Sequence, residues 1–107
     1  MNYTSLLQDK RLTVLLSGEI DHHTAREIME AINGKLETYL PRSCMLDFGA
    51  VTFMDSSGIA IVIHCLRAMR ELGGSLTLTN IPAQPMKVLQ AAGIQRLVTV
   101  NEERSPA

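Results

Sequence analysis

The stretch FMDSSGIAIVIHCL, residues 53–66, joins the end of an apolar strand to the start of an apolar helix through Asp55-Ser56-Ser57-Gly58. Aspartate and serine are favoured at the N-terminus of a helix, where a capping side chain contributes about 1 kcal/mol. One capping residue is enough to begin a helix, so an aspartate and two serines are more than the local structure needs. The junction is therefore the first candidate for a functional site.

Length and composition predict one compact domain. The chain has 107 residues, of which 46% are hydrophobic and 20% are charged, as in ordinary globular proteins. We expect a core over about residues 3–100 and a short tail at residues 101–107. The net charge is −1 and no basic stripe is present, which argues against nucleic acid as a direct partner.

No segment of the sequence suggests export or membrane insertion. The first residues, MNYTSLLQDKR, lack a basic leader followed by an apolar stretch, so no secretory signal is predicted. The aliphatic run from Ile59 to Ile63 is far shorter than the ~20 residues that span a bilayer. Cys44 and Cys65 fit no metal or redox spacing, so we expect two buried thiols in a reducing compartment. The expected location is the cytoplasm, without a membrane partner.

Apolar periodicity along the chain alternates between the period of a strand and that of a helix. It predicts five strands, at residues 3–8, 11–17, 44–51, 75–80 and 96–100. It predicts three helices, at about residues 21–40, 57–72 and 85–92. The order ββαβαβαβ predicts an α/β fold, in which helices pack on a mixed, mostly parallel sheet. Only the first strand is expected to be antiparallel, through a hairpin at Asp9-Lys10.

The first expected helix is amphipathic, and its start lies in the loop GEIDHHT. Its apolar positions at helical spacing are Ala25, Ile28, Met29, Ile32, Leu36 and Leu40. Asp21 or Thr24 can cap the N-terminus, with Glu27 three residues after Thr24 as in a capping box. Pro41 is expected to end the helix.

The loops GEIDHHT and FMDSSG follow the second and third strands, and parallel strands bring their C-terminal ends to one edge of a sheet. We therefore expect Asp21 to lie near Asp55. Adjacent residues at a helix start point about 100° apart, so Asp21, His22 and His23 are poorly placed to share a metal ion. His64 cannot be assigned to such a set. We expect a capping aspartate beside exposed histidines, with no metal and no cofactor.

Two interpretations of the DSSG junction remain open from the residues alone. The serines are helix caps and nothing more, or one of them is a phosphorylation site. A phosphoserine at a helix N-terminus would meet free amide N–H groups and the positive end of the helix dipole. It would also add nearly two negative charges to an exposed edge of the sheet.

Enzymatic interpretations have less support, and we expect a protein without enzymatic activity. A serine hydrolase would need the pattern G-x-S-x-G, and a phosphate-binding loop would need its glycines and lysine; neither is present. No general base is expected beside Ser56 or Ser57. Phosphorylation of Asp55 itself would require an acidic pair after an early strand and a lysine near the last strand. Asp21 has only Glu19 as an acidic neighbour and so does not form the required pair, and the segment RLVTVNEE contains no lysine.

Four segments, in this order and spacing, resemble a known family. SGEIDHHTA, FMDSSGIAIVI, GGSLTLTNI and PMKVLQAAGI resemble the STAS domain, and more narrowly the bacterial anti-sigma factor antagonists. The combination of GEIDHHTA with FMDSSG is most similar to the sporulation type that frees sigma-F. The resemblance covers roughly residues 3–100. Family members usually carry a further C-terminal helix, whereas here the last expected strand runs into NEERSPA. Part of one face would then be exposed or covered by another element.

The resemblance implies a partner-switching mechanism. Such antagonists bind an anti-sigma factor that is also a serine kinase, and so release the sigma factor it holds. The kinase phosphorylates the serine after the motif aspartate, here Ser56, and a serine phosphatase restores binding. The implied partner-binding residues are Asp21, Asp55, Ser57, Gly58 and Ile59. The alternative is a STAS scaffold or small-ligand-binding module without a phosphoswitch.

Overall fold

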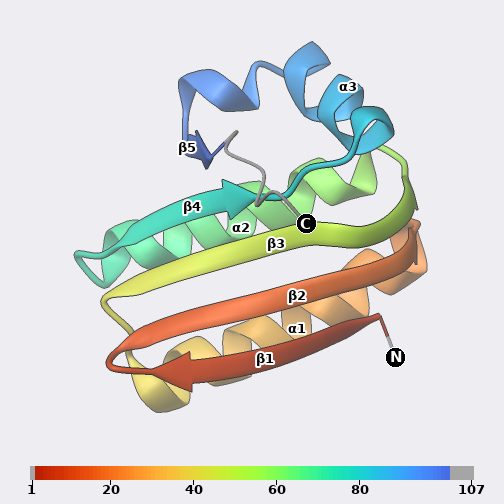
Figure 1. Cartoon of the computed structure of the whole chain (residues 1–107). Coiled ribbons are helices and arrows are strands. Elements are labelled where there is room, and N and C mark those ends of the chain that lie inside the picture. The colour runs from red at the N-terminus through yellow and green to blue at the C-terminus, as the bar shows by residue number, and fades with distance from the viewer. Residues whose placement is uncertain (1, 102–107) are drawn as a thin grey trace.

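The computed structural model describes residues 2–101 and confirms the predicted order of elements (Figure 1). The strands are β1 (Tyr3–Gln8), β2 (Arg11–Ile20), β3 (Ser43–Met54), β4 (Ser75–Thr79) and β5 (Thr99–Asn101). The helices are α1 (His22–Tyr39), α2 (Ser57–Glu71) and α3 (Ala83–Ala91), followed by a 3₁₀ turn at Ile94–Arg96. Within the described part of the chain, no helix has the length and apolar character needed to cross a membrane.

The five strands form one mixed sheet in the order β1-β2-β3-β4-β5. β1 pairs antiparallel with β2, and the other three pairs are parallel, as predicted. Asp9 and Lys10 form the hairpin turn between β1 and β2, and both have positive φ angles, of 51° and 66°. That backbone suits the right-handed twist of a two-residue hairpin.

Helices α1 and α2 lie side by side on one face of the sheet, behind it in Figure 1. Alternate residues of the central strands point into this layer and are buried against the helices. The core strand residues include Leu12, Val14, Leu16, Cys44, Leu46, Phe48, Leu76 and Leu78. Of the apolar positions predicted for α1, Ala25, Ile28, Ile32 and Leu36 are buried, and Met29 is half-buried. The alternation of buried and exposed residues in the strands therefore fixes which face carries the helices.

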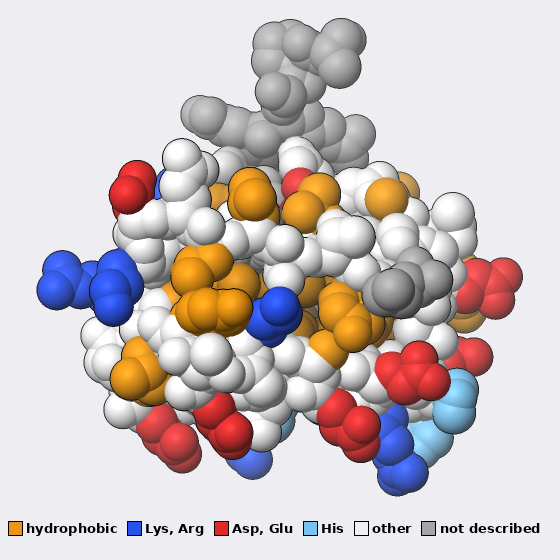
Figure 2. Space-filling model, turned by 90° about the horizontal axis from the view of Figure 1, so that it is seen from below, with side chains coloured by type: hydrophobic (Ala, Val, Ile, Leu, Met, Phe, Trp, Pro, Cys, Tyr) orange, Lys and Arg blue, Asp and Glu red, His pale blue; other side chains and the backbone are white. Residues whose placement is uncertain are grey.

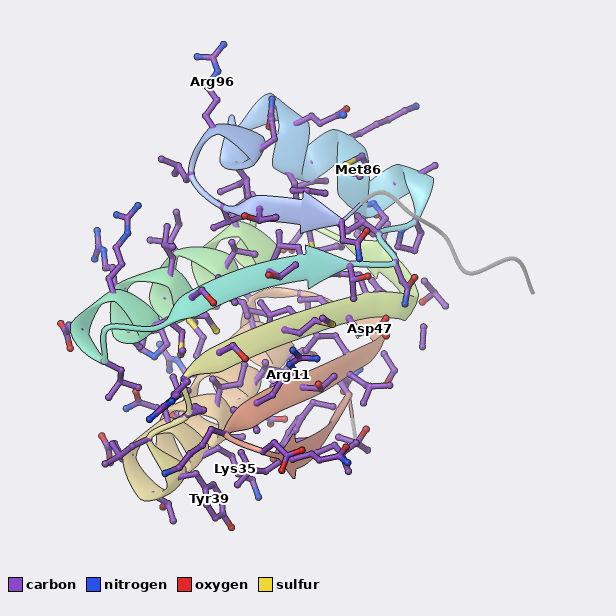
Figure 3. The ribbon with its side chains drawn as sticks, turned by 60° about the vertical axis from the view of Figure 1, so that its left-hand side comes forward. Arg11, Lys35, Tyr39, Asp47, Met86 and Arg96 are labelled. Carbon is purple, nitrogen blue, oxygen red and sulfur yellow. The ribbon has the colours of Figure 1, made fainter. Side chains whose placement is uncertain are left out.

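The opposite face of the sheet carries polar and mixed side chains. Leu15 of β2 and Met45 and Asp47 of β3 are exposed or half-buried there. Figure 3 shows Arg11 and Asp47 on these two strands. Asp47 accepts hydrogen bonds from the Gly49 amide at 2.8 Å and from Asn80 Nδ2 at 3.1 Å, which ties β3 to the end of β4. Asn101, predicted to begin the tail, is the last residue of β5. The rest of the tail, residues 102–107, lies outside the described residues.

The structure corrects four details of the sequence-based prediction. β2 and β3 each run three residues beyond the predicted ends, to Ile20 and Met54, because the parallel pairing of the two strands continues through the start of the predicted loops. Leu40 is not part of the apolar face of α1: it is the C-cap residue, with φ of 45°, and 57% of its side chain is exposed because the chain turns before Pro41. Helix α3 begins two residues before Pro85, since proline is tolerated in the first turn of a helix. The last strand is short because Ile94–Arg96 forms a 3₁₀ turn instead.

Candidate functional site

The loops that follow β2 and β3 meet at one edge of the sheet, as the sequence predicted. Ile20 at the end of β2 pairs with Met54 at the end of β3. The Asp55 amide donates a hydrogen bond to the Ile20 carbonyl at 3.1 Å, so the contact extends beyond the last paired residues. Asp21 and Asp55 each come directly after this pair. The structure thus places both predicted aspartates at the same rim, which we call the DSSG rim.

Asp55 is the side chain that stabilises the start of α2. Its Oδ1 accepts a hydrogen bond from the Ser57 amide at 2.8 Å. Ser56 occupies the N-cap position, yet its hydroxyl makes no capping hydrogen bond. Ser56 is exposed, and Ser57 is half-buried. The cap is therefore the aspartate, and the Ser56 hydroxyl is not used to hold the helix.

The amides at the start of α2 are already engaged, which corrects one sequence-based expectation. The Ser57 amide donates to Asp55 Oδ1, the Gly58 amide to the Asp55 carbonyl at 3.1 Å, and the Ile59 amide to the Ser56 carbonyl at 3.1 Å. A phosphate on Ser56 would therefore not find these N–H groups free. Because Ser56 is exposed, the phosphate would face solvent at the outside of the rim.

Gly58 is required by packing against the last residue of β3. A Cβ atom built on Gly58 would collide with Sδ and Cγ of the Met54 side chain, which is fully buried. Gly58 is itself buried, and the next residue, Ile59, is half-buried against the core. The glycine of the motif therefore allows α2 to start directly over the end of β3. This close approach presents Ser56 at the surface.

Gln84 of α3 is a rim residue that the sequence analysis missed. Its Oε1 accepts from the Met54 amide at 2.8 Å, and its Nε2 donates to the Met54 carbonyl at 2.8 Å. The side-chain amide thus satisfies both backbone groups of the residue before Asp55, as a neighbouring strand would. No local sequence signal marks such a contact, because the two residues are 30 positions apart.

Asp21 is the N-cap of α1, so one of the two capping alternatives is correct and Thr24 does not fill that role. Asp21 Oδ1 accepts a hydrogen bond from the Thr24 amide at 2.8 Å. The bond from this backbone amide lowers the pKa of the Asp21 carboxyl below its usual value. His23 Nε2 lies 3.1 Å from Glu27 Oε1 on the exposed side of the helix. Among residues 2–101, no cluster of histidine, cysteine and acidic side chains is suited to hold a metal.

An exposed aromatic side chain stands at the end of β3, shortly before the DSSG motif. Phe53 precedes Ser56 by three residues in the chain and leaves 48% of its surface exposed. It is the partner of Glu19 in the register of β2 and β3. Large exposed aromatics next to exposed polar groups are frequent anchors in protein interfaces. Phe53 is therefore a further rim residue that reasoning from the DSSG motif alone did not select.

The two cysteines are buried and unpaired, as the sequence predicted. Burial raises the pKa of the Cys44 thiol to about 12 and raises that of Cys65 as well. Both thiols lie in the core beneath the sheet and belong to packing rather than to the rim.

Comparison with known proteins gives consistent matches. The family model described as the STAS domain matches residues 5–107. The anti-sigma F factor antagonist of Paenibacillus polymyxa is 24% identical over 89 residues, which cover 83% of this chain and 76% of that protein. The anti-sigma-B factor antagonist of Staphylococcus aureus is 24% identical over 102 residues, covering 95% and 94%. The sequence-based resemblance to antagonists of anti-sigma factors is thus confirmed, while sigma-F and sigma-B types match alike.

Solved structures confirm the fold. The anti-sigma factor antagonist SpoIIAA in its unphosphorylated form superimposes with a TM-score of 0.82 at 24% identity, over 94% of this chain and 89% of that one. The phosphorylated form from Bacillus gives a TM-score of 0.73 at the same identity, over 94% and 92%. The names of these relatives describe regulators rather than enzymes, in agreement with the expectation from the sequence.

Proposed function

Because the chain belongs to the STAS domain family, we propose that it is an anti-sigma factor antagonist controlled by phosphorylation of Ser56. In this proposal the chain binds an anti-sigma factor with serine kinase activity and thereby frees a sigma factor. The kinase then phosphorylates Ser56 and ends the interaction, and a serine phosphatase restores it. The names of the matched relatives support the choice of partner. The proposed location of this partner switching is the cytoplasm. A more specific version of the proposal is that the released sigma factor is sigma-F and that the chain controls sporulation.

One observation carries the proposal: the Ser56 hydroxyl is exposed and has no structural task. The Asp55 carboxylate caps α2 in its place. A kinase can therefore reach the hydroxyl, and a phosphoryl group can be added without breaking a hydrogen bond that holds the fold. A serine that served as the cap would have coupled modification to loss of helix stability.

The charge on the rim explains how phosphorylation can switch binding. Asp21 and Asp55 already make the rim acidic, and a phosphate adds nearly two further negative charges. Shifting an equilibrium from 1:99 to 99:1 takes about 5.5 kcal/mol. Two unit charges 4 Å apart contribute about 4 kcal/mol at an effective dielectric constant of 20. A dianion that faces a partner carboxylate, together with its bulk, reaches this range without any refolding.

The proposed partner surface consists of the DSSG rim and the start of α2. Asp21, Asp55 and Ser57 supply its polar groups, and half-buried Ile59 adds apolar area. Gly58 is buried and contributes by letting α2 start directly over the end of β3. Phe53 extends this surface with the exposed ring described above. Exposed aromatic side chains are enriched in protein interfaces.

The test is a comparison of two Ser56 variants in binding to the host's anti-sigma factor kinase by calorimetry. Ser56→Ala should bind with the affinity of the unmodified protein, whereas Ser56→Asp should bind at least about tenfold more weakly, a difference of about 1.4 kcal/mol. Thr38→Asp adds the same charge at an exposed position near the end of α1 and should leave affinity unchanged. Equal affinities for the two Ser56 variants would rule out the rim as the switch and favour a scaffold or ligand-binding role.

A further inference from the structure

The outer edge of β1 is a second surface with the features of an interface. β1 is the first strand in the sheet order, so within residues 2–101 only the edge that faces β2 is paired. The Ser17 amide donates to the Asn2 carbonyl at 2.8 Å, so Asn2 is a residue whose backbone groups face β2. In an antiparallel pair, alternate residues direct both backbone groups to the neighbour. The backbone groups of Thr4, Leu6 and Gln8 therefore face β2, and those of Tyr3, Ser5 and Leu7 face outward.

This edge lacks the protection that sheet edges usually carry. Exposed edge strands are normally blunted by charged residues, prolines or bulges, which prevent pairing with another chain. β1 has the sequence YTSLLQ, without a charge or a proline, and pairs with β2 in regular register over all six residues. The side chains of Leu6 and Leu7 are 60% and 40% exposed.

Apolar side chains continue from the edge onto both faces of the molecule. Leu15, beside Thr4 in the register of β1 and β2, is 42% exposed on the open face of the sheet. On the helix side, Lys35 lies over the ring of Tyr39, with Nζ 5.8 Å from the ring centroid, and Figure 3 shows both beneath β1. Figure 2 views the molecule from the β1 edge and shows hydrophobic side chains gathered across its middle on either side of a Lys or Arg side chain, with acidic side chains below them.

We propose that the outer edge of β1 pairs antiparallel with the same edge of a second copy of this chain. The register that makes the most hydrogen bonds has its two-fold axis at Ser5. Ser5 then faces Ser5 of the second copy, and Tyr3 faces its Leu7, so each outward-facing residue on either chain donates and accepts one bond. This pairing forms six backbone hydrogen bonds, whereas a register centred on Leu6 forms four. It also sets an aromatic ring against a leucine, a favourable cross-strand pair.

A second copy fits this edge because a two-fold axis brings each residue near its own equivalent. A charged edge strand would repel itself in such a pair, and the Tyr3–Gln8 segment carries no charge. The pairing would join two five-stranded sheets into one of ten strands and cover the exposed leucines of both chains. The two DSSG rims would lie at opposite ends of that sheet, because antiparallel pairing reverses the strand direction. The inference therefore does not depend on the proposed function.

Hydrogen exchange of the unmodified protein tests the pairing residue by residue. Between a dilute sample and one at about 1 mM, the Tyr3, Ser5 and Leu7 amides should become at least about tenfold more protected. The Thr4, Leu6 and Gln8 amides, already bonded to β2, should keep their rates relative to one another and to the core. Sedimentation of the same samples should show a dimer at the higher concentration. A monomer at about 1 mM, or protection without this alternation, would overturn the proposal.

Charge variants at the two-fold axis provide the matched test. Ser5→Lys or Ser5→Glu places two like charges opposite each other and should raise the dimer dissociation constant at least about tenfold, whereas an equimolar mixture should restore a heterodimer. Ser75→Lys makes the same exchange at an exposed strand position away from the edge and should leave the dimer intact. Dimers that persist in both Ser5 variants would overturn the pairing. So would an edge that becomes protected only when an anti-sigma factor is added.

Discussion

The contact between Gln84 and the end of β3 predicts that a residue outside the DSSG motif holds the rim in place. In Gln84→Ala, the Met54 amide and carbonyl lose both of their side-chain hydrogen bonds, each 2.8 Å long. A hydrogen bond contributes about 1 kcal/mol net, and a partly buried group left without a partner adds to the loss. We therefore expect the free energy of unfolding to fall by about 2–3 kcal/mol, which corresponds to a melting temperature lower by roughly 8–12 °C.

The matched control is Gln90→Ala in the same helix. Gln90 is exposed, so its replacement should change the free energy of unfolding by no more than about 0.5 kcal/mol. Urea unfolding followed by circular dichroism measures both variants, and amide exchange at Asp55 and Ser57 reports whether the rim itself loosens. If Gln84→Ala is no less stable than Gln90→Ala, the side-chain contact with β3 does not support the rim and the reasoning is wrong.

A second variant at this position separates hydrogen bonding from side-chain volume. In Gln84→Glu, a carboxylate can accept from the Met54 amide but cannot donate to the Met54 carbonyl. The protonated form can do both, so we expect the folded protein to raise the pKa of this glutamate above its unfolded value of about 4.3. The stability it contributes is then present below that value and lost as the pH rises through the folded pKa. The deficit relative to the parent protein should therefore be largest near neutral pH and shrink below about pH 4.

Three further predictions concern the packing, the capping and the thiols. Gly58→Ala should lower the free energy of unfolding by about 1–3 kcal/mol because the new methyl group meets Met54. Gly34→Ala in α1, with open space around the added carbon, should raise the free energy of unfolding by up to about 1 kcal/mol. Urea unfolding compares the two variants. Capping of α1 lowers the pKa of Asp21, so the stability this carboxylate adds is present above the ordinary aspartate pKa and is lost as the pH falls through the lowered, folded-state pKa. Asp21→Ala should therefore remove this part of the loss of stability at acidic pH, measured by unfolding curves at several pH values. The two buried thiols, of which Cys44 has a pKa of about 12, should stay unreactive toward a disulfide reagent at pH 8 in the folded protein and react fully in urea; rapid reaction of the folded protein would contradict their burial.

The fold was predictable because its signals are local and periodic. The strand and helix periods gave the element order, and the Asp9-Lys10 turn gave the hairpin. Parallel connections place the ends of β2 and β3 together, so the order of elements alone predicts that Asp21 and Asp55 share one rim. The length of β5 was not predictable, because a 3₁₀ turn and a strand compete over the same apolar residues near Val98.

The site was only partly predictable from the motif. The pattern DSSG indicated a capped helix start but not which oxygen forms the cap, since aspartate and serine are about equally favoured there. The structure assigns the cap to Asp55 and leaves Ser56 free of it. Gln84 and Phe53 could not be found from the motif, because one reaches the rim through a tertiary contact and the other depends on which face of β3 is uncovered.

The central claim is that Ser56 carries the signal, and phosphorylation of the intact protein tests it most directly. The chain is incubated with the host's anti-sigma factor kinase and ATP, then analysed by intact-mass spectrometry and peptide mapping, with Ser56→Ala as the control. We predict one added phosphoryl group of about 80 Da, located on Ser56 and absent from the control. A folded protein that gains no phosphoryl group, or gains it at another residue, would contradict the account and leave DSSG as the start of a helix.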